Sequence, residues 1–272
     1  MSSAYNLSWF VKASQVEEKP IIAVSLNYRV GYWGFLSGNA LSAEGNTNLG
    51  LYDQRLALHW VKENIGAFGG DPDKITIFGQ SAYLPLITTL TPRGAISVAA
   101  QMFAFGGRDD HLFRAAIMES GPPTTGQYPL YQTATSEASN AAYEAVIVKA
   151  GCATVADTLS CLRSLNYSSV FKAFQVPENA PLSTFHPVVD GAFFEQSPAT
   201  QIMASQFVKI ATLQGHNDDE GSLFPPISVV SNSDNETKDY IRSRCLAKVV
   251  LTIRHMAVLQ QFSNRAYHGI IS

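Results

Sequence analysis

A serine follows a predicted β-strand in a pattern that is typical of a reactive nucleophile. The stretch KITIFG alternates β-branched and polar residues and ends at Gly79, which opens the quartet Gly79-Gln80-Ser81-Ala82. These are the first four positions of a G-x-S-x-G elbow, in which a strained turn lifts the serine hydroxyl clear of a sheet for attack on a carbonyl. The fifth position is Tyr83 instead of glycine, and four such letters alone also occur at strand ends by accident. The quartet therefore predicts acyl-transfer chemistry at Ser81 only if its surroundings agree.

The elements expected around Ser81 alternate between strands and helices. Apolar runs and helical periodicity predict strands over 21–28 (IIAVSLNY, buried on both faces), 74–79, 114–119 and 208–213, and helices over 48–65, 95–105 and 136–150. Asn48 is available as the cap of the helix over 48–65, whose apolar residues are Leu49, Leu56 and Trp60, with Ala57, Val61 and Ile65 beside them. This order predicts an α/β fold with a mostly parallel, doubly wound sheet, whose active site lies at the carboxyl ends of the strands. Without repeats or a low-complexity linker, residues 1–272 are treated as one domain.

Composition excludes several classes of function. The chain has 272 residues, of which 15% are charged, and its formal net charge is −3 without a basic run. We therefore expect no nucleic-acid partner. The apolar stretches 21–26 and 246–253 are too short or interrupted to span a bilayer, so we expect no stable membrane insertion, and no leader opens the chain. We expect no cofactor and no metal, and we expect a small-molecule substrate.

The cysteines and the N-glycosylation triplets give information about the cellular compartment in which the protein is found. Cys152 and Cys161 are close enough in sequence to close a small loop, while Cys245 is isolated. The alternative is a pair of buried thiols in a reducing compartment. Three N-x-S/T triplets, at Asn6, Asn166 and Asn235, are a weak indication of a glycosylated, secreted protein.

Several blocks of the sequence resemble the type-B carboxylesterase and lipase family of α/β-hydrolases, which includes cholinesterases and a group of fungal lipases. They are VSLNYRVGYWGFL, NTNLGLYDQRLALHWVKENIGAFGGDPDKITIFGQSA, GAISVAAQMFAFGGRDDHLFRAAIMESGPP, AGCATVADTLSCLRSL, FHPVVDGAFF and LQGHNDDEGSLF, in the family's order. The resemblance implies a serine hydrolase that cleaves small-molecule or lipid esters through an acyl-enzyme. It also implies secretion and a disulfide between Cys152 and Cys161.

The resemblance makes residues 83–93 an insertion. Gly94-Ala95-Ile96-Ser97 is similar to the continuation that the family has immediately after Ala82, so excising YLPLITTLTPR would restore G-x-S-x-G. A misplaced splice boundary or retained genomic segment is one source of such an insertion, and a natural loop insertion is the other.

The family's remaining catalytic groups map unevenly onto the chain. The block LQGHNDDEGSLF places the triad acid at Glu220, although a solvated acidic turn is the alternative. The N–H of Ala82 is the retained oxyanion donor. The histidines at 59, 111, 186 and 216 are expected to be structural or surface residues, and neither His255 nor His268, in a tail that diverges after about residue 243, is assigned as the base.

Resemblance therefore implies a fragment. The family's glycine-rich oxyanion loop belongs before residue 5 and its catalytic histidine beyond the C-terminus, so the sheet is expected to be incomplete at both ends. The two alternatives are an ester hydrolase whose activity in this chain is impaired, and an inactive member or truncated gene product with at most a binding role. The family implies secretion, whereas the chain as written has no signal peptide and would stay in the cytoplasm.

Overall fold

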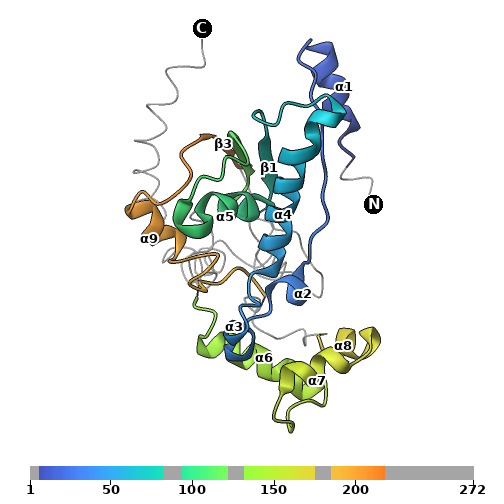
Figure 1. The fold of residues 1–272 in the computed structure, drawn as a ribbon, viewed down its shortest axis with the longest axis vertical. Helices are drawn as coiled ribbons and strands as arrows, with labels where there is room; N and C mark the ends of the chain where they lie inside the picture. Colours follow the sequence, from blue (N-terminus) through green and yellow to red (C-terminus); the bar gives the residue numbers. More distant parts are fainter. Residues whose placement is uncertain (1–5, 82–93, 122–131, 175–184, 218–272) are drawn as a thin grey trace, which may run out of the picture.

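The core of the fold is a parallel sheet. The computed structural model describes residues 6–81, 94–121, 132–174 and 185–217. Strands β1 (Thr76–Gln80), β2 (Ala115–Glu119) and β3 (Ala211–Gly215) form a sheet of order β1-β2-β3, with both pairs parallel (Figure 1). Parallel neighbours require crossover connections that carry helices. The predicted parallel α/β architecture is therefore confirmed, with β3 beginning three residues later than the sequence pattern indicated.

Helix α5 (Gly94–Gly107) covers one face of this sheet. Ile77 of β1 and Ala116 and Met118 of β2 point toward it, because alternate residues of a strand face the same side. Every residue of α5 from Ala95 to Ala104 is buried, as expected of a helix that is apolar on all sides. Helix α4 (Leu49–Asn64), continued by the 3₁₀ turn η2 (Ile65–Phe68), packs beside α5.

A second apolar cluster lies below the sheet in Figure 1. Helix α3 (Asn39–Ala43) contacts α7 (Thr158–Ser164), and α6 (Glu137–Lys149) contacts α8 (Tyr167–Ala173). Serine, aspartate and asparagine side chains at residues 136, 157 and 166 cap α6, α7 and α8 by accepting the N–H three residues on. The remaining described helices are α1 (Ser8–Val16), α2 (Gly31–Phe35) and α9 (Pro198–Met203).

A disulfide joins Cys152 and Cys161 in this second cluster, with 5.8 Å between the Cα atoms. It connects the turn after α6 to α7, and Cys152 is fully buried. The bond that the family resemblance implied is present. The third cysteine, Cys245, lies outside the described residues.

Removing this disulfide is expected to lower the free energy of unfolding by about 2–3 kcal/mol, because a closed loop of this length restricts the unfolded chain by that amount. The change is Cys161→Ser, measured by urea unfolding beside the unmodified chain with and without reductant. The variant and the reduced chain should unfold at the same urea concentration. Equal midpoints for the oxidised chain and the variant would show that the bond does not constrain the fold.

Two expectations from the sequence are wrong. The run Ile21–Tyr28 belongs to no strand, and Ile21 and Ile22 are about half exposed. It passes α4 as a coil (Figure 1), and Arg29 beyond it donates to Asp53 of that helix. An apolar run becomes a buried strand only if a neighbouring strand pairs with it, and no described strand does.

The second correction concerns α4. The helix itself is confirmed, but Asn48 makes no capping hydrogen bond and has a left-handed backbone with φ 52°. Leu56 and Trp60, expected on the apolar face, are exposed. Val61, expected beside them, is buried, and the buried face also carries Leu51, Gln54, Arg55 and Leu58. Gln54 and Arg55 on this face form hydrogen bonds with α5, and Arg55 also donates to Asp110 after it. These bonds, and not hydropathy alone, determine which face of α4 is buried.

The opposite face of the sheet is largely uncovered among the described residues. Ladder register puts Phe78, Ile117 and Leu213 in one row across the three strands, and Phe78 and Leu213 are 45% and 58% exposed. Phe10 of α1 contacts the Phe78 ring at 5.9 Å between centroids. We call Phe78, Ile117 and Leu213 the uncovered row.

Candidate active site

Ser81 lies immediately after β1 in a strained backbone conformation. Its φ is 82°, a value that non-glycine residues rarely adopt outside turns that the surrounding structure holds in place. The Ser81 N–H donates to the carbonyl of Glu119 at 2.8 Å, and the Ser81 carbonyl accepts from the N–H of Ala95 at 3.2 Å. Bonds to β2 on one side and to α5 on the other therefore fix the backbone of the predicted nucleophile.

The turn is packed backbone against backbone. A Cβ atom added at Gly79 would lie 2.3 Å from the carbonyl carbon of Gly94, and one added at Gly94 would lie 2.7 Å from the amide nitrogen of Gln80. Neither position has room for a side chain. The structure thus places Gly94 against the strand just before Ser81, where the fifth residue of a G-x-S-x-G elbow is required to be small.

The neighbouring strand ends in a similar turn. Ser120 follows β2 with φ 59°, and its N–H donates to the carbonyl of Gly215 at 2.7 Å. Register aligns Gln80, Glu119 and Gly215, so the carboxyl ends of the three strands form one edge, with Ser120 between Ser81 and the end of β3. In parallel α/β sheets, ligands bind at this edge. The Ser120 N–H thus connects the end of β2 to the end of β3 at this edge.

Some predicted site residues lie outside the described residues. They are Ala82 and Glu220, and the insertion 83–93 and the two unassigned histidines, His255 and His268, lie outside them as well. Glu220 follows Gly215 of β3 by five residues, so the chain leads toward it from the same edge that carries Ser81. Ser81 as nucleophile, Ala82 as oxyanion donor and Glu220 as acid remain predictions.

The described histidines fit structural or surface positions. His59, His111 and His216 are exposed, whereas His186 is 2% exposed, with Nδ1 3.0 Å from the carbonyl oxygen of Pro187. His216 follows β3 directly and is thus the described histidine at the edge that carries Ser81; its Nδ1 is 3.0 Å from the carbonyl oxygen of Asn217.

A buried polar cluster anchors the start of α4. Asn48 is 1% exposed, and its amide donates to the carbonyl of Val188 and to Asp190 at 2.8 and 2.7 Å. Thr47 donates to the same Asp190 carboxylate at 2.9 Å, and Asp190 accepts from the N–H groups of Ala192 and Phe194. Sequence reasoning assigned Asn48 to a cap and did not find Asp190, whose side-chain partners Thr47 and Asn48 are more than 140 residues away.

A second charged cluster connects α4 to the end of α5. The Arg55 guanidinium donates to Asp110, and Arg108 donates to the same carboxylate at 2.7 and 3.0 Å. Both guanidinium groups also lie over the Phe105 ring, 5.1 and 4.8 Å from its centroid. Hydrogen bonds from Arg108 and then from Arg55 lower the pKa of Asp110 to about 2, against the effect of its partial burial. The cluster positions α5, whose first turn contacts Ser81.

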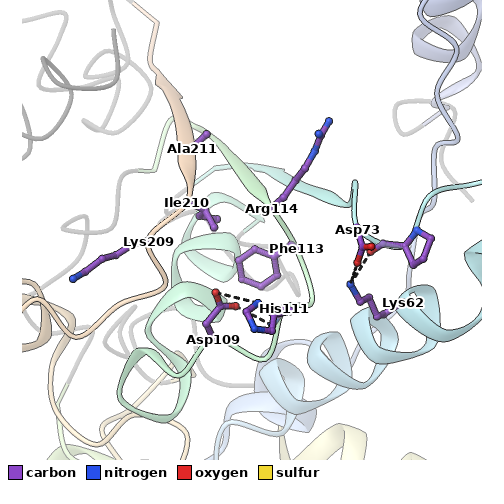
Figure 2. Close-up of a pocket in the computed structure, with 10 residues that line it drawn as sticks. Lys62, Asp73, Asp109, His111, Phe113, Arg114, Lys209, Ile210 and Ala211 are labelled. Carbon is purple, nitrogen blue, oxygen red and sulfur yellow. Dashed lines mark hydrogen bonds and ion pairs between the residues drawn. The ribbon is translucent and has the colours of Figure 1, made fainter. Parts of the chain in front are cut away.

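A surface pocket lies at the opposite ends of the strands (Figure 2). Phe113 and Arg114 precede β2, and Lys209 and Ile210 precede β3, so the pocket opens at the amino edge of the sheet. Its lining includes two ion pairs, Lys62 with Asp73 and His111 with Asp109. The pocket and Ser81 lie at opposite ends of the strands, and we assign the pocket no part in the chemistry.

The described residues contain no group of three or more histidine, cysteine, aspartate or glutamate side chains that could hold a metal ion. Within the same residues, no helix has the length and apolar character needed to cross a bilayer.

Comparison with known proteins agrees with this geometry. The carboxylesterase family matches residues 2–267. Lipase 2 of Geotrichum candidum is 36% identical over 255 residues, covering 89% of this chain and 42% of the lipase, and Secreted lipase 1 of Botryotinia fuckeliana is 40% identical over 235 residues, covering 82% and 38%. The crystal structure of Aspergillus niger EstA superposes with a TM-score of 0.70 at 32% identity, covering 88% of this chain and 43% of EstA. The chain thus spans about two fifths of the length of these relatives. With its parallel sheet and strained serine turn, this chain has the α/β-hydrolase fold and belongs to the carboxylesterase family.

Proposed function

We propose that this chain carries the nucleophile of a carboxylic ester hydrolase and that Ser81 is that nucleophile. The observation that supports it most is the turn after β1, where Ser81 has φ 82° and the flanking positions Gly79 and Gly94 have no room for a side chain. A strained serine between a strand and a helix presents its hydroxyl at the carboxyl edge of the sheet. Strain of this kind costs about 1–3 kcal/mol and persists only where surrounding contacts enforce it.

The reaction would follow the acyl-enzyme route. The Ser81 Oγ adds to the ester carbonyl carbon while a histidine base takes its proton, and the negative oxygen is held by the N–H of Ala82. Collapse breaks the bond to the alcohol, which leaves with that proton, and water then releases the carboxylic acid by the same steps. Glu220 would accept the histidine Nδ1–H and hold the ring in the required tautomer.

The base decides how much activity the chain has. A histidine base is what activates the serine of a triad, and removal of a triad histidine costs about a millionfold in turnover in a serine protease. Loss of one oxyanion donor costs about a hundred- to thousandfold. The alternative to the hydrolase is a family member that keeps the fold with at most a binding role.

Esters of fatty acids are the substrate class that the relatives favour, because several of them are named lipases. We propose secretion as the setting, since a relative is named a secreted lipase and the Cys152–Cys161 disulfide persists in oxidising compartments.

The test is covalent labelling of Ser81 by a fluorophosphonate, read by intact mass and by the modified peptide. We expect one adduct on the unmodified chain, located at Ser81, and none on Ser81→Ala. The exposed Ser168 provides a matched control, and Ser168→Ala should label like the unmodified chain. A cooperatively melting sample that takes no label would reject the nucleophile and leave the binding role.

A further inference from the structure

We propose that Asn166 is an N-glycosylation site, and that its side-chain amide carries the sugar through its nitrogen while it caps α8 through its oxygen. The sequence contains three equivalent triplets, at Asn6, Asn166 and Asn235. Asn235 lies outside the described residues, and Asn6 is next to residues 1–5, which lie outside them as well. The structure therefore describes Asn166 with its neighbours on both sides. The inference rests on the proposed secretion, because N-linked sugars belong to secreted proteins.

The modification is a group transfer to the amide nitrogen. A bond forms between Asn166 Nδ2 and C1 of an N-acetylglucosamine, while the bond from C1 to the diphosphate of a lipid-linked oligosaccharide donor breaks. Nδ2 gives up one proton, and the lipid diphosphate leaves. The product keeps the Oδ1 acceptor and one N–H. The acceptor also needs a hydroxyl two residues later and no proline between, which Ser168 and Tyr167 provide.

The triplet lies on the surface of the protein. Asn166 is in the short connection between α7 and α8, and Asn166, Tyr167 and Ser168 are all exposed. Tyr167 is 67% exposed, although its ring stacks on Trp33. A glycan is bulky and solubilising, so a folded chain accommodates it only where the acceptor faces solvent. The exposure of all three residues meets this requirement.

The hydrogen bonding of Asn166 uses the oxygen of its amide. Asn166 Oδ1 accepts from the N–H of Ser169 at 2.9 Å, which is the bond of a capping side chain. Within the described part of the chain, no recorded hydrogen bond engages Asn166 Nδ2. Oxygen and nitrogen point in different directions from the same carbon atom, so the bond through Oδ1 turns Nδ2 away from the first turn of α8. A sugar on Nδ2 then costs the helix none of its hydrogen bonds.

The disulfide in the same segment points to the same compartment. Cys161, five residues before Asn166, is bonded to Cys152. Disulfides form and persist in oxidising compartments, among them the lumen through which secreted proteins pass. N-linked sugars are carried by proteins that take this route. The disulfide and the triplet are therefore two separate features of one segment that require the same setting.

The experiment produces the full chain in yeast behind a secretion signal supplied by the vector, which delivers it to the secretory route whatever its native setting. Asn166→Asp removes Nδ2 and keeps a capping oxygen, and Ser168→Ala removes the triplet hydroxyl and keeps Asn166. Ser168→Thr preserves the triplet. Ser169→Ala is the matched control, because Ser169 is an exposed serine outside the triplet and bonds to Asn166 through its backbone N–H.

Cells and medium are both analysed by gel mobility and by peptide mass after treatment with peptide N-glycosidase, which converts a glycosylated asparagine to aspartate. We expect this conversion at Asn166 in the unmodified chain, in Ser168→Thr and in Ser169→Ala. Before treatment, Asn166→Asp and Ser168→Ala should each migrate faster than the unmodified chain by the shift of one glycan.

Thermal unfolding tests whether the same amide also caps α8. Asn166→Ala removes the capping oxygen and should have a Tm about 2–4 °C below that of Asn166→Asp, because aspartate is as good a cap as asparagine and alanine is not. Both variants lack the sugar, so the difference in Tm reports the cap alone.

Two results would overturn the proposal. One is a delivered chain whose Asn166 carries no sugar, and the other is an Asn166→Ala variant that melts at the same temperature as Asn166→Asp. The proposed secretion fails separately, if the native protein stays inside the cells that make it. The signal supplied by the vector keeps these two failures distinguishable.

Discussion

Replacing Asp110 with alanine is expected to lower the free energy of unfolding by about 3–5 kcal/mol, the usual cost of leaving a buried charge without its partner. The charge in question is Arg55, whose side chain is 6% exposed and whose guanidinium donates to Asp110. Arg55 also donates a long hydrogen bond to Gln101 at 3.4 Å and lies over the Phe105 ring, and neither contact supplies a negative charge. The same substitution should also loosen the end of α5. Both Arg55 and Arg108 donate to Asp110 and lie over the ring of Phe105 in that helix, so without the carboxylate neither guanidinium is fixed over the ring.

Urea unfolding at pH 7 measures this loss, with Arg108→Ala as the control. Arg108 donates to the same carboxylate but is 61% exposed, so its removal should lower the free energy of unfolding far less than Asp110→Ala does. Equal losses for the two variants would show that the burial of Arg55 carries no special cost.

The pH dependence follows from the pKa of Asp110, which is lowered to about 2. A carboxyl group with a depressed folded pKa contributes stability above its unfolded pKa of about 3.9 and loses it as pH falls through the folded value. The difference in unfolding free energy between the unmodified chain and Asp110→Ala should therefore shrink between about pH 4 and pH 2. A constant difference over this window would contradict a lowered pKa of Asp110 in the folded chain.

Replacing Asp190 with alanine is expected to cost about 3–4 kcal/mol, because its carboxylate accepts four hydrogen bonds and a hydrogen bond to a charged group is worth about 1.5–3 kcal/mol before non-additivity. Two of the donors, Thr47 and Asn48, are 3% and 1% exposed and would be left partly unsatisfied where water does not reach them. Denaturant unfolding measures the loss.

The variant Asp190→Asn distinguishes the contribution of the carboxylate charge to stability from the contribution of the side chain's shape. An asparagine oxygen in the Oδ1 position can still accept from the N–H groups of Ala192 and Phe194, whereas its NH₂ group cannot accept from Thr47 or Asn48. The asparagine variant should therefore lose about half as much stability as the alanine variant. If asparagine matched the unmodified chain, the carboxylate would be no more than a spacer in this cluster.

Local patterns predicted the elements whose identity depends on their own residues. The strands β1 and β2 and the helices α5 and α6 were predicted within a few residues, because each combines an uninterrupted period with turn residues at its ends. The strand predicted over 21–28 was wrong, because a β-strand forms only where a neighbouring strand pairs with it. Leu56 and Trp60 were placed on the wrong face because Gln54 and Arg55 are buried through polar bonds to α5, which hydropathy does not register.

In the candidate site, too, residues in local turns could be predicted, whereas residues held by long-range contacts could not. Gly79 could be inferred from the motif, because a strand-to-helix turn is a local structure, whereas Gly94 was inferred only from the resemblance to the family. Asp190 and Asp110 could not, because their bonds join segments 142 and 55 residues apart and no short pattern signals them. Asn48 was assigned to a cap by a rule that is correct for isolated helices, while the fold uses its side chain to bind Val188 and Asp190.

The uncovered row of Phe78, Ile117 and Leu213 affects how stability varies with temperature. Unfolding raises the heat capacity by newly hydrating apolar surface, and among the described residues Phe78 and Leu213 are already about half exposed in the folded chain. Each such residue contributes less to the heat-capacity increment than it would in a sheet covered on both faces. We therefore expect a flatter curve of unfolding free energy against temperature. Cooling or warming away from the temperature of maximum stability should then lower the stability less than it would for a sheet of the same size covered on both faces.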